Sequence, residues 1–295
     1  MSEVIIQPGT QSSTQFGLQI INEQPIKLTQ NVTNGPVTSV GSTGKDSIKA
    51  VSASSTLAYT IQSGAGDDTV VTAAGADGLS GEAGNDVLDA SAGNDGISGG
   101  LGNDILFAGA GNDFAAGDDG NDSITGAAGD DVLQGGNGDD VLSGDAGNDI
   151  LRGGAGKDVL SGGAGNDTLR GDAGNDILNA GPGRDILKGD AGRDTFRFAK
   201  GSIGRDLDII RDFTPSEDVI EISRKVLPGS GLRKGQLKES DFAVVKGISS
   251  ADANAKIVYD SASGIVYYNP SKGSDVPLFK MQKNLEVSAN DFRIF

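Results

Sequence analysis

The sequence predicts an all-β solenoid, and three observations support this prediction. From Ser63 to Arg197 a nine-residue unit repeats fifteen times without insertion or deletion. Position four is Gly and position six is Asp in every unit, and position eight is a large apolar residue in all units except the one that has Ala115 there. A period of nine does not fit the period of about 3.6 residues of a helix, so we expect each unit to form a Gly-rich turn and a very short strand whose position eight faces inward.

The residues before the repeats predict a polar segment and a cap. Residues 1–40 are rich in Gln, Thr, Ser and Asn, and alternation over residues 16–20 and 26–29 predicts two weak strands. Residues 41–49 look like one isolated unit, which begins 22 residues before Ser63 and is therefore out of phase with the period of nine. Because solenoids usually carry an atypical segment at each end, we expect residues 41–62 to form the N-terminal cap.

Residues 198–295 have the composition of an ordinary globular domain. Alternation over residues 208–213 and 218–222 predicts strands, and residues 256–269 predict a β-hairpin. We therefore expect a small β domain that caps the solenoid of residues 63–197. Within that solenoid we expect Ala115 to leave the core under-packed unless Phe107 or Phe114 compensates.

The charge of the chain is concentrated in the repeats. The chain has a formal net charge of −17, and residues 63–197 alone carry −18, against +1 for all other residues. A segment rich in Gly with one large apolar residue in nine should not fold unaided. A disordered acidic tail would need no fixed phase, whereas these carboxylates recur at one position, which predicts an ordered array of cation sites. An acidic chain is also a poor partner for nucleic acid or an anionic membrane.

The residue types select the cation and exclude several classes of enzyme. Carboxylates and backbone carbonyls on tight Gly turns suit calcium, which takes about six to eight oxygen ligands, better than magnesium, which demands a strict octahedron. The chain has no His and no Cys, which disfavours zinc and copper and excludes His-based triads. Gly96–Gly100 matches G-x-S-x-G, but it lies within the repeat register and no His is present to activate Ser98. We expect no catalytic residues, no transmembrane segment and no N-terminal signal peptide.

The repeat unit resembles the calcium-binding nonapeptide of RTX proteins over residues 63–197. This resemblance implies a right-handed parallel β-roll, in which two units form one coil and calcium lies between turns stacked on the same side. It implies that the side chain at position six and the backbone carbonyls near positions two and four are the ligands. The implied carboxylate ligands are Asp68, Asp77, Asp86, Asp95, Asp104, Asp113, Asp122, Asp131, Asp140, Asp149, Asp158, Asp167, Asp176, Asp185 and Asp194. The implied carbonyl ligands include those of Gly100, Gly102, Gly136, Gly138, Gly154, Gly156, Gly163 and Gly165.

The implied geometry also limits the number of calcium ions. Fifteen turns divide into eight on one side and seven on the other, so seven gaps and six gaps enclose at most thirteen sites. The segment after the repeats resembles the C-terminal part of serralysin-type and related secreted proteins over residues 208–213, 218–222, 257–269 and 287–292. That resemblance implies an uncleaved signal for the type I secretion machinery at residues 291–295. The alternative is that Phe292 and Phe295 merely close the β cap, and both roles can hold together.

These observations predict a secreted, non-enzymatic calcium-binding protein of the extracellular matrix or cell surface, whose roll folds on binding extracellular calcium. The alternative is an adhesin, or an accessory module that binds extracellular polysaccharide for a secreted enzyme, through the outward-facing Arg152, Arg170, Lys188 and Arg197. An ice-binding solenoid is disfavoured because position seven is Thr in only three of the fifteen units. An activity based on Asp or Glu in residues 1–62 and 198–295 stays open.

Overall fold

The computed structural model describes residues 2–6, 17–19, 26–32, 37–52, 58–199, 207–227, 230–246, 255–269 and 275–295. Almost all regular structure in these ranges is β-strand, and the helical segments there are two 3-10 helices of three residues each. The chain divides into two compact units, residues 1–146 and 147–295. The all-β class and the parallel β-roll expected from the sequence are confirmed.

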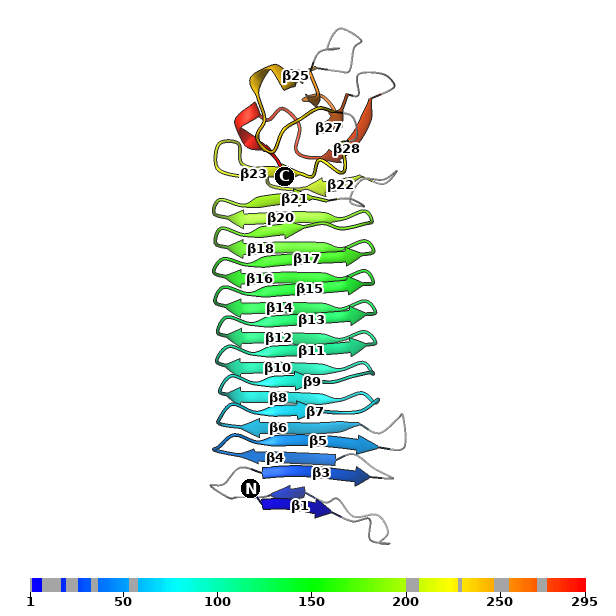
Figure 1. Ribbon diagram of the computed structural model, residues 1–295, viewed down its shortest axis with the longest axis vertical. Helices are drawn as coiled ribbons and strands as arrows, with labels where there is room; N and C mark the ends of the chain where they lie inside the picture. The colour runs from blue at the N-terminus through cyan, green and yellow to red at the C-terminus, as the bar shows by residue number, and fades with distance from the viewer. Residues whose placement is uncertain are drawn as a thin grey trace. The chain divides into compact units, whose positions relative to one another are not determined.

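The first compact unit, residues 1–146, is a stack of short strands (Figure 1). The strands are β1 (Ser2–Ile6), β2 (Gly17–Gln19), β3 (Ile26–Val32), β4 (Val37–Ser42), β5 (Ser47–Ser52), β6 (Tyr59–Gly64), β7 (Thr69–Val71), β8 (Gly78–Ala83), β9 (Val87–Asp89), β10 (Gly96–Leu101), β11 (Ile105–Ala110), β12 (Phe114–Asp119), β13 (Ser123–Ala128), β14 (Val132–Asn137) and β15 (Val141–Ala146). Odd-numbered strands from β1 to β15 form one parallel sheet and even-numbered strands from β2 to β14 form the other.

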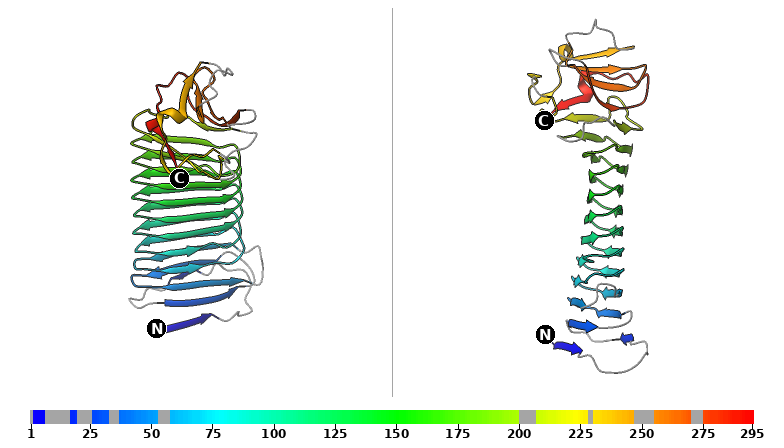
Figure 2. Two further views of the ribbon diagram at one scale, coloured as in Figure 1. Left: turned by 45° about the horizontal axis from the view of Figure 1, so that its top comes forward. Right: turned by 90° about the vertical axis from the view of Figure 1, so that its right-hand side faces the viewer.

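Within residues 63–146, each strand pairs with the strand that lies two nonapeptides further along the chain. Ile105 of β11 pairs with Ser123 of β13, and Phe114 of β12 pairs with Val132 of β14, so the register is 18 residues in both sheets. The chain therefore alternates between two sheets as it coils. The right-hand view of Figure 2 shows these strands nearly end-on. Because 18 residues are two nonapeptides, residues at the same position of the repeat lie next to each other in neighbouring strands.

The alternation of the strands sends positions six, eight and one into the roll. Leu88, Leu106 and Leu133 at position eight have no exposed surface, and Gly81 and Gly99 at position one are buried. Burial of one such leucine contributes about 1.5–3 kcal/mol. The large apolar side chains stack into two rows, and the small residue at position one leaves room beside the turn.

The isolated unit at residues 41–49 joins the stack although its spacing is out of phase. Residues 47–49 of β5 pair in order with residues 69–71 of β7. The inward and outward faces of the sheet are therefore preserved. The strands predicted over residues 16–20 and 26–29 correspond to β2 and β3. The division of the chain into a polar segment, a cap, a roll and a C-terminal domain stays a proposal.

Neither phenylalanine fills the space beside the small side chain of Ala115, so the alternative that Phe107 or Phe114 compensates is wrong, and local under-packing at Ala115 stays a prediction. Ala115 is completely buried, but Phe107 and Phe114 occupy positions nine and seven and are 43% and 44% exposed. The reason is the two-residue alternation of a strand, which sends the neighbours of an inward residue to the outer face.

The second unit continues the same pattern and ends in a more irregular region. Its elements are β16 (Ile150–Ala155), β17 (Val159–Ala164), β18 (Thr168–Ala173), β19 (Ile177–Asn179), β20 (Ile186–Ala191), β21 (Thr195–Phe198), β22 (Asp208–Ile210), β23 (Val219–Ile222), β24 (Gly235–Gln236), η1 (Glu239–Asp241), β25 (Phe242–Val245), β26 (Ile257–Asp260), β27 (Ile265–Tyr268), β28 (Val276–Lys280), η2 (Ala289–Asp291) and β29 (Phe292–Ile294). Within this unit the sheet orders are β17-β19-β21-β23-β29-β24 and β16-β18-β20-β22-β28-β27-β26-β25.

The last residues of the chain are built into this unit. The expected hairpin is present, because β26 pairs with β27 in antiparallel fashion. Strand β29 pairs in parallel with β23, and Phe292 is completely buried. The Asp291 side chain accepts hydrogen bonds from the backbone N–H groups of Ser216 and Ser288. This packing shows a structural role for the C-terminal residues, and the proposed secretion signal stays a prediction.

Candidate metal centre

The aspartates at position six form columns along the inside of the turns. In residues 1–146, the backbone N–H of one aspartate donates to Oδ1 of the next aspartate in the same column. One column consists of Asp46, Asp68, Asp86, Asp104, Asp122 and Asp140, and its donor–acceptor distances are 2.6–2.8 Å. The other column in this range contains Asp77, Asp95, Asp113 and Asp131, joined in the same way at 2.7–2.8 Å.

The second compact unit, residues 147–295, also contains two columns of aspartates. The backbone N–H donates to Oδ1 of the next member at 2.9–3.0 Å in the columns Asp158, Asp176, Asp194, Asp218 and Asp149, Asp167, Asp185, Asp208. The structure thus places every sequence-predicted aspartate in a column, all of them at most 4% exposed. Asp46, Asp208 and Asp218 extend the columns beyond the predicted set.

The second oxygen of these carboxylates is buried without a partner in much of the array. No hydrogen-bond partner reaches Oδ2 of Asp86, Asp95, Asp104, Asp113, Asp122, Asp167, Asp176, Asp185 and Asp208. A buried acceptor without a partner is costly, and more so when it is charged. A row of such oxygens is the environment that a bound cation would satisfy.

The glycine at position one leaves the space that this oxygen faces. A Cβ atom at Gly99 would overlap Oδ2 of Asp104 and lie 2.8 Å from the carbonyl oxygen of Gly117 in the next turn. At Gly117 a Cβ atom would likewise overlap Oδ2 of Asp122 and lie 2.7 Å from the carbonyl oxygen of Gly135. Two oxygen acceptors from successive turns therefore converge beside each such glycine.

The predicted carbonyl ligands lie between successive turns. The carbonyl oxygens of Gly102, Gly156, Gly163 and Gly165 face the Cα atoms of Gly120, Gly174, Gly181 and Gly183, where a Cβ atom would overlap them. Gly100, Gly136 and Gly138 in turn face carbonyl oxygens of the preceding turn, those of Glu82, Asp118 and Gly120. The backbone φ of Gly154 is positive, at 119°. This placement puts backbone oxygens along the stacking direction, and their role as ligands stays a prediction.

Burial dominates the electrostatics of the array. Burial raises the pKa of Asp86 to about 7, and the neighbouring carboxylates of Asp104 and Asp68 add to the rise, although the backbone N–H of Asp68 acts in the opposite direction. Burial likewise raises the pKa of Asp95 and of Asp167 to about 7, and that of Asp208 to about 8. The charged columns therefore destabilise the folded chain at neutral pH unless a positive charge compensates them.

The donor set fits calcium. The available atoms are carboxylate and carbonyl oxygens, which are the ligands of a hard cation. In the described ranges no three acidic side chains gather to share one ion. Each site would therefore combine carboxylates with several backbone carbonyls, as the sequence comparison with the RTX nonapeptide implies.

Sequence reasoning missed Asp208 and Asp218 as members of the columns. Each is followed two residues later by a buried apolar side chain, Ile210 or Ile220, which is the pattern of positions six and eight. The Gly-rich turn that precedes this pattern in the repeats is missing there, so the period of nine could not reveal them.

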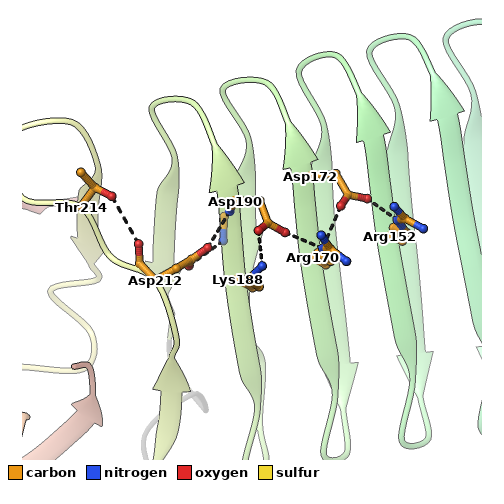
Figure 3. A network of polar contacts seen from close by, with 8 residues as sticks. Arg152, Arg170, Asp172, Lys188, Asp190, Asp212 and Thr214 are labelled. Carbon is orange, nitrogen blue, oxygen red and sulfur yellow. Dashed lines mark hydrogen bonds and ion pairs between the residues drawn. The ribbon is translucent and has the colours of Figure 1, made fainter.

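The outward-facing cations on the second unit are engaged in ion pairs (Figure 3). Arg152 and Arg170 both contact Asp172, and Arg170 and Lys188 both contact Asp190, with Arg170 Nε 2.8 Å from Asp172 Oδ1. Arg197 pairs with Glu221 at 2.7 Å. The side chains proposed to hold an acidic polysaccharide therefore already have acidic partners on the same face.

None of the helices in the described part of the chain has the length and hydrophobicity that a membrane crossing needs.

Comparison with known proteins identifies the repeats. The family model of the RTX calcium-binding nonapeptide repeat (four copies) matches residues 60–79, 72–106, 80–115, 98–133, 116–151, 134–169, 143–178 and 161–196. No curated protein matches the chain. Among solved structures, the AlgE6R3 subunit of the Azotobacter vinelandii mannuronan C5-epimerase matches with 30% identity over 49% of this chain and 77% of that chain, at a TM-score of 0.34. That TM-score is too low to support the fold or a function.

The serralysin-like character of the C-terminal region is not confirmed by these matches. The family match, in contrast, covers the predicted array of Asp and Gly residues. The chain therefore belongs to the family of proteins that carry RTX calcium-binding nonapeptide repeats, through residues 60–196 of its sequence.

Proposed function

We propose that this chain is a secreted, non-enzymatic calcium-binding protein whose β-roll folds when it meets extracellular calcium. The observation that supports the proposal most strongly is the row of buried carboxylate oxygens without hydrogen-bond partners, for example Oδ2 of Asp86, Asp104 and Asp122. Their burial is unfavourable in the chain alone, so folding needs a compensating charge.

The residues of each turn would share the work of holding the ion. The carboxylate at position six brings negative charge, and the carbonyls at positions two and four bring neutral oxygen ligands from the backbone. A bound calcium ion supplies the positive charge that these oxygens lack. Because the unfolded chain has no such assembled set of oxygens, metal-binding free energy becomes folding free energy.

The mechanism connects folding to the calcium level of the compartment. At low calcium, repulsion between the stacked carboxylates opposes the roll, which favours an unfolded chain that an exporter can pass. Extracellular calcium modules typically bind at about 10⁻⁴–10⁻³ M, so the roll would assemble outside the cell. The export route by type I secretion is part of this proposal.

The alternative role in binding extracellular polysaccharide has weaker support. Arg152, Arg170 and Lys188 already lie against Asp172 and Asp190, which favours a structural, solvated role for these cations.

A calcium titration followed by far-UV circular dichroism tests the proposed folding switch. We expect a cooperative transition from coil to β structure with calcium, and no comparable transition with magnesium at the same concentrations. A chain that is already β-rich in chelator, and that does not change with calcium, would refute calcium-driven folding.

A further inference from the structure

The two columns of aspartates end differently after the repeats. Asp208 is the last member of one column, and its Oδ1 accepts the backbone N–H of Asp185 at 2.9 Å. Asp218 ends the other column, and its Oδ1 accepts the backbone N–H of Asp194, also at 2.9 Å. Both carboxylates are buried and lie beyond residues 60–196, which match the repeat family. The difference between them lies in the second oxygen of each carboxylate.

The chain itself satisfies the second oxygen of Asp218. The backbone N–H of Thr214 donates to Asp218 Oδ2 at 2.8 Å, and the backbone N–H of Asp218 donates to the carbonyl oxygen of Thr214 at 2.9 Å. These two hydrogen bonds close the turn that leads into β23. Each oxygen of the Asp218 carboxylate therefore has a backbone donor, so this column ends without the need for a cation.

The second oxygen of Asp208 lacks such a donor. No described residue donates a hydrogen bond to Oδ2 of Asp208 or to Oδ2 of Asp185 in the preceding turn, and both oxygens are buried. None of the ion pairs in the described ranges includes either residue. Buried carboxylate oxygens without a partner oppose folding, and two of them in successive turns also repel each other. This end of the column therefore lacks a positive charge.

Asp208 lies where the repeats meet the residues that follow them. Its strand, β22, lies between β20 and β28 (Figure 1). Ile209 pairs with Ile186 of β20, and the backbone N–H of Ile209 donates to the carbonyl oxygen of Asp185 at 2.8 Å. Asp208 itself pairs with Phe279 of β28. A ligand held by Asp208 would therefore stabilise both contacts of β22.

Resting on the proposed calcium-binding function, we propose that Asp208 forms a further calcium site with the turn of Asp185, outside the nonapeptide repeats, whereas the backbone closes the other column at Asp218. The ion satisfies Oδ2 of Asp208. Backbone carbonyls complete its shell, because calcium takes about six to eight oxygen ligands. The ceiling of thirteen sites set by fifteen nonapeptides rises by one at this end. Because β22 also pairs with β28, this ion makes the stability of the C-terminal residues depend on calcium.

The experiment counts calcium ions bound per full-length chain by equilibrium dialysis at saturating calcium, with folding followed by circular dichroism. The test variant is Asp208→Asn, which keeps an acceptor for the backbone N–H of Asp185 and removes the charge. We expect it to bind one ion fewer than the parent chain. Asp218→Asn is the matched control, because it makes the same change at the end of the other column. We expect it to bind as many ions as the parent.

Hydrogen exchange of the β28 amides in saturating calcium gives a second readout. We expect faster exchange in Asp208→Asn than in the parent. Exchange at the parent rate would overturn the dependence of the C-terminal residues on this ion.

An unchanged ion count in Asp208→Asn would overturn the further site, and loss of an ion in Asp218→Asn would overturn the distinction between the two ends. If either variant does not fold, anomalous scattering from crystals of the parent grown with calcium decides, with an ion expected beside Asp208 and none beside Asp218. Ions beside Asp86 and Asp104 but none beside Asp208 would overturn the further site alone. A parent chain that binds no calcium would refute the proposed function itself.

Discussion

The charge on one buried carboxylate should act in opposite directions with and without calcium. Asp86 is 1% exposed, its Oδ1 accepts the backbone N–H of Asp68 at 2.7 Å, and its Oδ2 has no partner. Asp86→Asn keeps an acceptor for that N–H but removes the charge. Without calcium the variant should therefore fold more readily, and with calcium it should lose a ligand charge.

The magnitude follows from the raised pKa. Burial raises the pKa of Asp86 from 3.8 to about 7. Each pKa unit corresponds to about 1.4 kcal/mol, so at pH 8 the ionised side chain costs the calcium-free roll up to about 4 kcal/mol. Because the folded-state pKa is above the unfolded one, this cost is absent below pH 3.8 and complete above pH 7.

The assay is osmolyte-driven folding in chelator at pH 8, since osmolytes favour burial without supplying a cation. We expect Asp86→Asn to need less osmolyte than the parent, and to have a lower thermal midpoint in saturating calcium. Asp139→Asn is the matched control, because Asp139 is exposed at position five and such changes usually stay within about 0.5 kcal/mol. An Asp86→Asn chain that is destabilised equally in chelator and in calcium would refute the reasoning.

Two further predictions follow from the same structure. In chelator, lowering the pH from 8 to 5 should increase the β content measured by circular dichroism. The reason is that the folded state binds protons more strongly than the unfolded state, because burial raises the pKa values of Asp86, Asp95, Asp167 and Asp208. Loss of β structure on acidification would contradict this prediction. Arg170→Ala removes contacts to Asp172 and Asp190, but the side chain is 45% exposed. We therefore expect the free energy of unfolding in urea to change by about 1 kcal/mol or less, with no change in the calcium midpoint; a larger loss, or lost binding to an acidic polysaccharide, would give the ion pairs a role that we do not expect.

The sequence predicted the repeating part of the fold because the position of a residue in the nonapeptide determines whether its side chain faces the interior. Strict spacing sets the register, so Leu106 had to face inward and Asp104 had to join a column. The positions of Asp208 and Asp218 could not be read in this way, because the linking residues between them and the repeats do not keep the period. Their stacking depends on pairing between strands that are distant in the sequence.

Two other features depended on three-dimensional context. The isolated nonapeptide at residues 41–49 is out of phase in the sequence, yet its strand pairs with β7 in register. A longer link between two strands costs little free energy, so the register does not require the strict period of nine. Ser63 and Thr72 stand at position one of the first two nonapeptides, where most nonapeptides have glycine. Only the distance to the carbonyls of Gly81 and Ala90 shows what they contact.

A crystal structure of the full chain grown with calcium, with anomalous scattering used to locate the ions, tests the central claim most directly. We expect two rows of calcium ions next to the carboxylates that have an unpartnered Oδ2, such as those of Asp86, Asp104 and Asp122, whose nonapeptides begin with glycine. A well-ordered roll at saturating calcium with no ions beside these carboxylates would contradict the account.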